Sequence, residues 1–143
     1  LNHAENPMTM TELSKTIARA RELGIETIAC ADSLAEGTAI AAFRPDILLC
    51  EPTDLIGTGK TADDNYTTSI VAKIRSIDPT IGIMIASGIT TADDVYRVVR
   101  LGADGSGATS GILSAPDPAA RIMEMAEAIV RAAAVRNTQG SAA

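Results

Sequence analysis

The sequence predicts an α/β fold built from parallel βα units. Short apolar runs of strand length alternate with longer amphipathic segments of helix length along the chain. A helix-start sequence also repeats, because residues 61–64 (TADD) recur at 91–94, an offset that fits one βα unit. Four such units behind a leading helix make about half of an eight-stranded barrel, and they would also suit a small doubly wound sheet.

The first half of the chain supplies the leading helix and the first βα unit. The helix begins at a cap, Thr9 or Thr11, and stops at Gly24. Residues 25–31 (IETIACA) are a β-branched run typical of a buried strand. A second helix, capped by residue 32 or 33, is expected to end near residue 43, before the Arg44-Pro45 break.

The second half continues the alternation of strand and helix. We expect strands over residues 47–50 and 81–86, a weak strand over 105–109, and helices over about 61–77, 91–101 and 116–136. In the repeat, Thr61 and Thr91 are the expected helix caps. Residues 1–136 are therefore predicted to form a single partial barrel domain, and residues 137–143 a disordered tail.

Composition excludes several kinds of partner. The chain has 143 residues, which falls well short of the roughly 250 residues of a complete eight-stranded barrel. Its net charge of −6 and its 2% of aromatic residues argue against nucleic-acid binding. Neither a membrane span nor a signal peptide is evident, so we expect a cytoplasmic protein. Cys30 and Cys50 lie in apolar runs, which indicates reduced thiols of the core.

The residues that carry chemistry follow the predicted strands, where parallel α/β folds gather their functional groups. Glu51 ends an apolar strand, where partial desolvation suits a carboxylate to act as a general base. A glycine-rich loop follows at residues 55–60 (LIGTGK), and Ser87-Gly88 and Ser110-Gly111 end the next strands. Backbone amides in three such turns would form a cradle for phosphate.

Plainer interpretations remain open for each of these features. Glu51 could simply pair with a cation, the glycines could only relieve turn strain, and His3, the single histidine, could be a bystander. Residues 59–61 (GKT) imitate the end of a Walker A motif, but Asp54 stands where that motif needs its first glycine. A metal site is not expected, since no second histidine accompanies His3.

Taken together, these pieces resemble triosephosphate isomerase, most closely its archaeal-type branch. The similarity runs through residues 2–5 (NHAE), 51–52 (EP), 55–62 (LIGTGKTA), 87–89 (SGI) and 109–111 (TSG), in the order found in that family. It implies a TIM barrel, of which this chain supplies strands five to eight. No cofactor is implied.

The resemblance also implies roles for individual residues. Glu51 would be the base that moves a proton between two carbons of the triose phosphate, and His3 the neutral imidazole that polarises the carbonyl. Residues 52–62 would form a lid that excludes water. The phosphate contacts implied by the family are Ile56, Gly57, Gly88, Thr109, Ser110 and Gly111.

Departures from the family limit what we expect of this chain alone. The family's Asn-x-Lys has no counterpart here, Ala4 replaces the usual serine, and residues 105–108 (GSGA) replace bulky aliphatics. We therefore expect little or no isomerase activity from the isolated chain, and completion of the barrel by a second copy or by a separate N-terminal half. Two alternatives remain: another sugar-phosphate barrel enzyme, such as a lyase or synthase, and a non-catalytic half-barrel assembly module.

Overall fold

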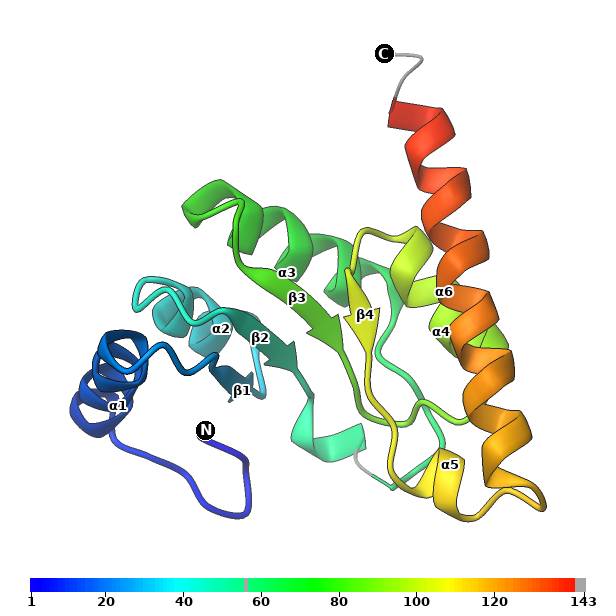
Figure 1. Ribbon diagram of the computed structural model, residues 1–143, viewed down its shortest axis with the longest axis horizontal. Helices are drawn as coiled ribbons and strands as arrows, with labels where there is room; N and C mark the ends of the chain where they lie inside the picture. Colours follow the sequence, from blue (N-terminus) through cyan, green and yellow to red (C-terminus); the bar gives the residue numbers. More distant parts are fainter. Residues whose placement is uncertain (56, 141–143) are drawn as a thin grey trace.

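The computed structural model describes residues 1–55 and 57–140, and within these a single parallel sheet forms the centre of the fold (Figure 1). Its strands lie in chain order, β1-β2-β3-β4, and each pairs in parallel with the next. The elements are α1 Met10–Glu22, β1 Ile28–Ala31, α2 Leu34–Ala41, β2 Ile47–Cys50, the 3₁₀ turn η1 Thr53–Leu55, α3 Asp64–Ile77, β3 Gly82–Ile85, α4 Ala92–Arg100, β4 Gly105–Ser106, α5 Ser110–Leu113 and α6 Pro118–Gly140. The predicted α/β class with a partial barrel is thereby confirmed.

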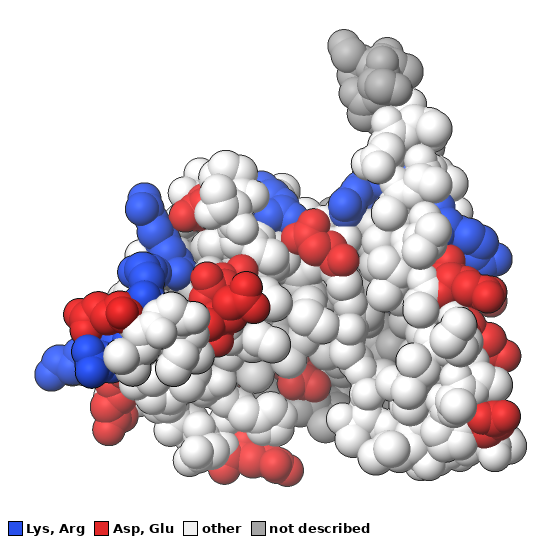
Figure 2. Space-filling model, viewed as in Figure 1, with Lys and Arg blue, Asp and Glu red and all other residues white. Residues whose placement is uncertain are grey.

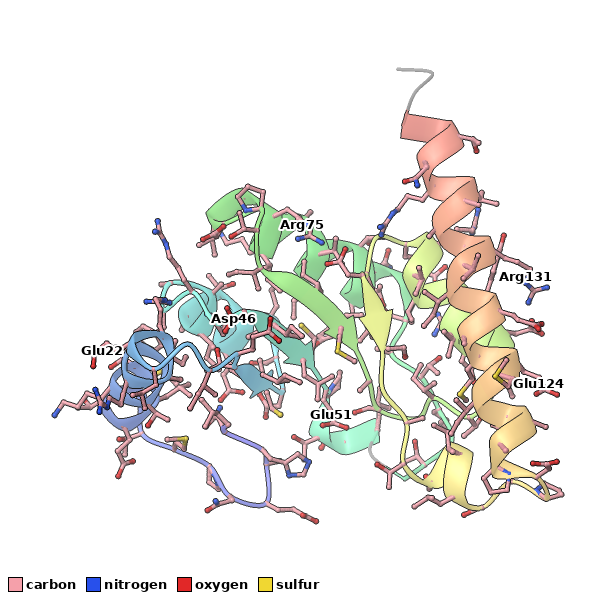
Figure 3. All side chains as sticks on the ribbon, in the orientation of Figure 1. Glu22, Asp46, Glu51, Arg75, Glu124 and Arg131 are labelled. Carbon is pink, nitrogen blue, oxygen red and sulfur yellow. The ribbon has the colours of Figure 1, made fainter. Side chains whose placement is uncertain are left out.

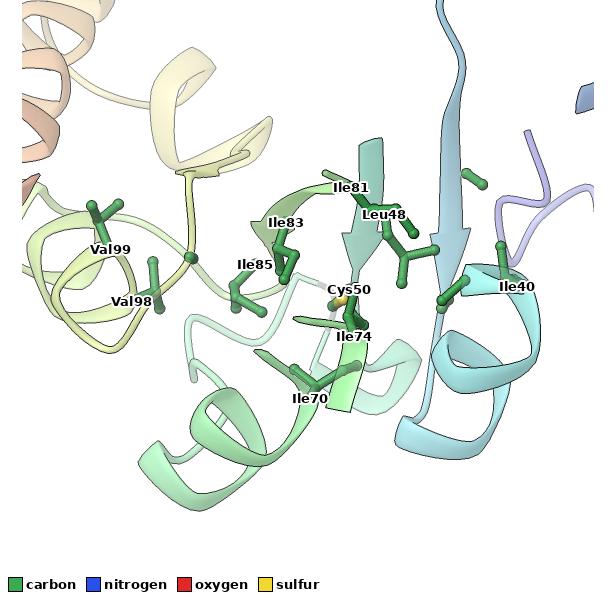
Figure 4. Close-up of a cluster of buried hydrophobic side chains, with 14 of the residues drawn as sticks. Ile40, Leu48, Cys50, Ile70, Ile74, Ile81, Ile83, Ile85, Val98 and Val99 are labelled. Carbon is green, nitrogen blue, oxygen red and sulfur yellow. The ribbon is translucent and has the colours of Figure 1, made fainter. Parts of the chain in front are cut away.

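The sheet has one face covered by helices and one that remains open. Alternate residues of β1, β2 and β3 are buried, as the two-residue period of a strand requires. The buried side chains pack against α2, α3 and α4; Figure 4 shows Leu48 and Ile83 of the sheet near Ile70 and Ile74 of α3. The other face presents partly exposed side chains, which are Ile28, Cys30, Ile47, Leu49 and Met84. We call this set the open face.

Local sequence explains where the helices begin and end. Thr9 caps α1 in a reciprocal capping box with Glu12, and Gly24, at φ +68°, follows the end of that helix. Ser33 caps α2 by accepting a hydrogen bond from the amide of Glu36. These caps agree with the starts predicted from the sequence.

Other boundaries differ from the prediction. The first strand starts at Ile28 instead of residue 25, and the last strand is reduced to Gly105–Ser106 because its small side chains offer little to pack. The helix predicted from residue 61 begins at Asp64, capped by Asp63 and not by Thr61. Helix α6 continues to Gly140, so residues 137–140 extend a helix where a tail was expected.

The two cysteines also occupy different surroundings. Cys50 is fully buried on the helix-covered side, and burial raises the pKa of its thiol to about 12. Cys30 lies half-buried on the open face, where partial burial raises the pKa of its thiol as well. Both are free thiols, and Cys30 is not part of the core.

Leu1 extends the sheet beyond β1. Its amino group donates a hydrogen bond to the carbonyl of Ile28, at 2.7 Å, and its carbonyl accepts one from the amide of Cys30, at 2.9 Å. Bonds to residues on either side of Ala29 are the pattern of a parallel ladder. Leu1 therefore sits where the end of a preceding parallel strand would lie, which brings residues 2–3 to the carboxyl edge of the sheet.

Candidate active site

Glu51 and His3 face one another at the carboxyl edge of the sheet. Glu51 follows β2 directly, and its amide donates to the carbonyl of Ala31 at 2.8 Å, which continues the ladder to its position. Its Oε2 lies 3.7 Å from Nε2 of His3. The Glu51 side chain is 17% exposed and the His3 side chain 44% exposed. Figure 3 shows Glu51 just beyond the end of β2, beside η1.

A backbone contact determines which imidazole nitrogen of His3 carries the proton when the ring is neutral. The amide of Glu5 donates to Nδ1 of His3 at 3.2 Å, so Nδ1 is the acceptor. A neutral imidazole has one donor and one acceptor nitrogen, and the proton therefore resides on Nε2. Nε2–H is the nitrogen nearer to Glu51, which gives the site a hydrogen-bond donor next to a carboxylate.

Both side chains line a cavity of about 390 Å³ at this edge. Of the sequence-predicted phosphate contacts, the structure places Gly57, Gly88, Thr109 and Ser110 in the wall of the same cavity. Gly57 follows η1, Gly88 follows β3, and Thr109-Ser110 lie after β4, so three separate turns meet around it. Ile56 lies outside the described residues.

Gly111 does not line this cavity and has a packing role instead. A β-carbon at this position would lie 2.3 Å from the carbonyl oxygen of Ile89 and 2.7 Å from the α-carbon of Thr90. Only glycine lets α5 approach the segment after β3 so closely. The structure therefore supports Gly111 as a spacer that brings two cavity turns together, and contact with a ligand stays a prediction.

The Ser87-Gly88 turn supports both ends of the segment from Pro52 to Lys60. The Ser87 hydroxyl donates to the carbonyl of Pro52 at 3.0 Å. A β-carbon at Gly88 would lie 1.9 Å from the carbonyl oxygen of Lys60. Since Ser87 and Gly88 both have left-handed backbones, at φ +71° and +68°, this turn is shaped to hold that segment against the cavity.

Among the described residues, no Lys or Arg side chain lines the cavity. Figure 2 shows acidic side chains but no Lys or Arg in the middle of the viewed face, with Lys and Arg towards its left, upper and right margins. The described residues also contain no group of three or more His, Cys, Asp or Glu side chains placed to hold a metal ion. A phosphate here would meet mainly backbone amides.

Sequence reasoning missed two residues that shape the site. Asn2, which is 8% exposed, stands directly before His3 and holds its segment with side-chain hydrogen bonds. The sequence indicates Ser87 only as the neighbour of Gly88. In the structure its hydroxyl binds the carbonyl of Pro52 and so holds the backbone that directly follows Glu51. Their polar side chains next to chemistry-bearing residues are a weak signal, because all of the partners except Met8 lie 28 to 35 residues away in the chain.

Comparison with known proteins decides the family. The family model described as triosephosphate isomerase matches residues 1–129. The chain belongs to the triosephosphate isomerase family. A triosephosphate isomerase of Sulfurisphaera tokodaii is 34% identical over 120 residues, which cover 82% of this chain and 52% of that protein. One of Metallosphaera sedula is 34% identical over 135 residues, covering 92% and 59%. The chain thus spans little more than half the length of these triosephosphate isomerases.

Solved structures share the fold. The Amycolatopsis orientalis BexX/CysO complex contains a chain that matches with a TM-score of 0.67 at 16% identity, over 91% of this chain and 52% of its own length. A mandelate oxidase structure matches with a TM-score of 0.59 at 15% identity, over 94% and 39%. At these identities the likeness concerns the fold alone. It agrees with a partial barrel.

Among the described residues, no helix is both long enough and apolar enough to cross a membrane.

Proposed function

We propose that this chain carries the base, the electrophile and the phosphate site of a triosephosphate isomerase, which interconverts dihydroxyacetone phosphate and D-glyceraldehyde 3-phosphate. The observation that supports this most strongly is the pair of His3 Nε2 and Glu51 Oε2, 3.7 Å apart in the cavity that three amide-rich turns also line. The family match over residues 1–129 favours this reaction over that of other sugar-phosphate enzymes.

In this proposal Glu51 moves the proton. Its carboxylate removes a proton from the carbon next to the substrate carbonyl, and the electron pair moves to the carbonyl oxygen to give an enediolate. Nε2–H of His3 donates a hydrogen bond to that oxygen. His3 then passes this proton to it and takes up the proton of the neighbouring hydroxyl, so that a proton moves between the two oxygens of the enediolate. Protonated Glu51 then returns the proton to the neighbouring carbon. This division of labour is the one established for the family and is carried over to Glu51 and His3 by position.

The phosphate would be held by main-chain donors. Turns at Gly57, Gly88 and Thr109-Ser110 surround one side of the cavity, so their amides are available without obstruction by large side chains. The segment from Pro52 to Lys60 would act as the lid, anchored at Pro52 by Ser87 and packed at Lys60 against Gly88. Lid closure removes water, which strengthens the hydrogen bonds to the developing enediolate.

The isolated chain lacks part of this machinery. A triose phosphate is anionic and Glu51 is acidic, but the described lining of the cavity has no Lys or Arg to offset that charge. We therefore expect little or no turnover by the chain alone. The open face and its apolar side chains call for a second copy or a separate N-terminal half that completes the barrel. A cytoplasmic location remains a prediction.

Proton exchange tests the role of Glu51 even where turnover is low. Dihydroxyacetone phosphate is incubated with the chain in D₂O, and deuterium at the carbon next to the carbonyl is followed by proton NMR. We expect exchange above the buffer rate for the wild-type chain and a return to the buffer rate for Glu51→Gln, which removes the base at nearly constant shape.

Glu26→Gln is the matched control, since Glu26 is an exposed acid in the loop before β1. It should exchange at the wild-type rate. Equal rates in the wild-type chain and Glu51→Gln would contradict the assignment of Glu51 as a base in this chain and would favour a non-catalytic assembly module.

A further inference from the structure

Asn2 is tied to three separate parts of the fold. Its Nδ2 donates to the carbonyl of Cys30 in β1, at 3.1 Å, and to Oε1 of Glu36 in α2, at 2.9 Å. Its Oδ1 accepts a hydrogen bond from the amide of Met8, at 2.9 Å. The side chain thus has partners for both donor hydrogens and for its oxygen, in a setting where an unpaired polar group would be costly.

These contacts fix the segment that carries His3. The bond from Met8 closes residues 3–7 into a loop whose base is the side chain of Asn2. Asn2 itself has a left-handed backbone, at φ +58°, a conformation that asparagine adopts more readily than most residues. The direction in which His3 leaves the sheet therefore depends on Asn2, both through its backbone and through its side chain.

Glu36 is the other half of this arrangement. While its Oε1 accepts from Asn2, its Oε2 accepts from the amide of Asp32, at 2.8 Å. One carboxylate in the first turn of α2 therefore holds both the His3 loop and the connection from β1 to α2. Neither Asn2 nor Glu36 lines the cavity that contains His3 and Glu51; both line a second pocket of about 380 Å³, on the wall of which Glu51 also lies.

We propose that Asn2 and Glu36 are the positioning pair of His3, and that their hydrogen bond keeps Nε2 of the imidazole directed at Glu51. The inference rests on the proposed function only in giving His3 a catalytic role. The pair acts through His3, because Asn2 closes the His3 loop, Glu36 holds Asn2, and neither side chain lines the cavity that His3 shares with Glu51. Their chemistry requires a donor on residue 2 and two acceptors on residue 36.

The direction of the hydrogen bond between residues 2 and 36 can be reversed by substitution. Asn2→Asp keeps the shape and the tolerance for a left-handed backbone, but it places an acceptor against the carboxylate of Glu36 and the carbonyl of Cys30. Adding Glu36→Gln gives residue 36 an amide that can donate to the new carboxylate at residue 2, while its oxygen still accepts from the amide of Asp32. The double variant thus restores one bond with donor and acceptor exchanged. Glu26→Gln controls for the loss of charge.

NMR can follow His3 without ambiguity, since it is the only histidine in the chain. We expect a nuclear Overhauser cross-peak between the His3 ring and the Glu51 side chain in the wild-type chain and in Glu26→Gln. Asn2→Asp should lose it, and the double variant should regain it. The amide spectra outside residues 1–9 show whether each variant is folded. A cross-peak that persists in Asn2→Asp, or that the double variant fails to recover, would overturn the proposal.

Proton exchange in dihydroxyacetone phosphate separates this inference from the proposed function. If the pair positions His3, the exchange rate above buffer should fall by up to about 100-fold in Asn2→Asp and recover in the double variant, because a misplacement of about 1 Å has effects of that size. If the cross-peaks change as expected but no chain exchanges protons above the buffer rate, the result would support the positioning and contradict the proposed function. Exchange unaffected by Asn2→Asp would contradict the positioning alone.

Discussion

Ser87 and Gly88 hold consecutive left-handed backbone conformations at the end of β3, and each has a different reason to be there. Ser87 is 5% exposed, and its hydroxyl binds the Pro52 carbonyl, which offsets the backbone strain. Gly88 has the carbonyl of Lys60 where a β-carbon would stand. Both residues act on the segment that follows Glu51, so the geometry of the base and of the lid depends on this one turn.

Gly88→Ala tests that close approach against a matched glycine. Gly24 has the same left-handed φ of +68° but nothing within 4 Å of its would-be β-carbon. Gly24→Ala should cost only the backbone penalty, about 1–2 kcal/mol. Gly88→Ala adds a collision with backbone and should lower the free energy of unfolding clearly further, as measured by urea denaturation. Equal losses in the two variants would show that Lys60 does not press against Gly88.

Helices α3 and α4 begin at different points of the same four-residue sequence, TADD, which stands at residues 61–64 and 91–94. In α4, Thr91 is the cap and Asp94 completes a capping box. In α3, Asp63 is the cap, because Arg97 of α4 holds the Thr61 hydroxyl and the Ala62 carbonyl outside the helix. A contact between helices, absent from any local pattern, thus shifts the start by two residues.

Alanine substitution at equivalent repeat positions measures this shift. Asp63→Ala removes a cap and should lower the free energy of unfolding by about 1 kcal/mol. Asp93→Ala removes only a first-turn charge and should cost about 0.3–0.5 kcal/mol. Thermal or urea unfolding compares the two variants. A larger loss in Asp93→Ala than in Asp63→Ala would contradict the observed register of α3.

Features that depend on local sequence could be predicted, whereas features that depend on contacts between distant residues could not. Periodicity and caps predicted the order of strands and helices, and the strand-end rule brought Glu51 together with Gly57, Gly88, Thr109 and Ser110. The start of α3 and the roles of Asn2 and Ser87 depend on partners 34 to 36 residues distant, and local patterns do not encode these. Gly111 fits the family motif, but its observed contact is with backbone and not with the cavity.

In the isolated molecule, the open face of the sheet exposes apolar side chains to water. Its side chains include Ile28, which is 46% exposed, and the two edges of the sheet are β1, extended only by Leu1, and the two-residue β4. Exposed apolar faces and strand edges of this kind favour association. The match spans only 52–59% of the two relatives compared, which agrees with the proposal that a second copy or an N-terminal half covers this face.

Association should therefore depend on the open face. Native mass spectrometry of the wild-type chain should show dimers or larger species, and Ile28→Lys should shift them to monomer by placing a charge on that face. Ala35→Lys, on the exposed side of α2, should leave the distribution unchanged. A wild-type chain that is monomeric throughout would contradict self-association and leave a separate N-terminal half as the remaining partner.

His3, Glu51 and three turns are proposed to form one site for a triose phosphate. Titration of the chain with dihydroxyacetone phosphate, followed by NMR, is the decisive measurement. We expect concerted shifts of the Gly57, Gly88 and Ser110 amides and of the His3 ring, with Gly24 unchanged, and smaller shifts at His3 when inorganic phosphate replaces the triose phosphate. Shifts confined to residues outside the cavity, or no shift at His3, would contradict it.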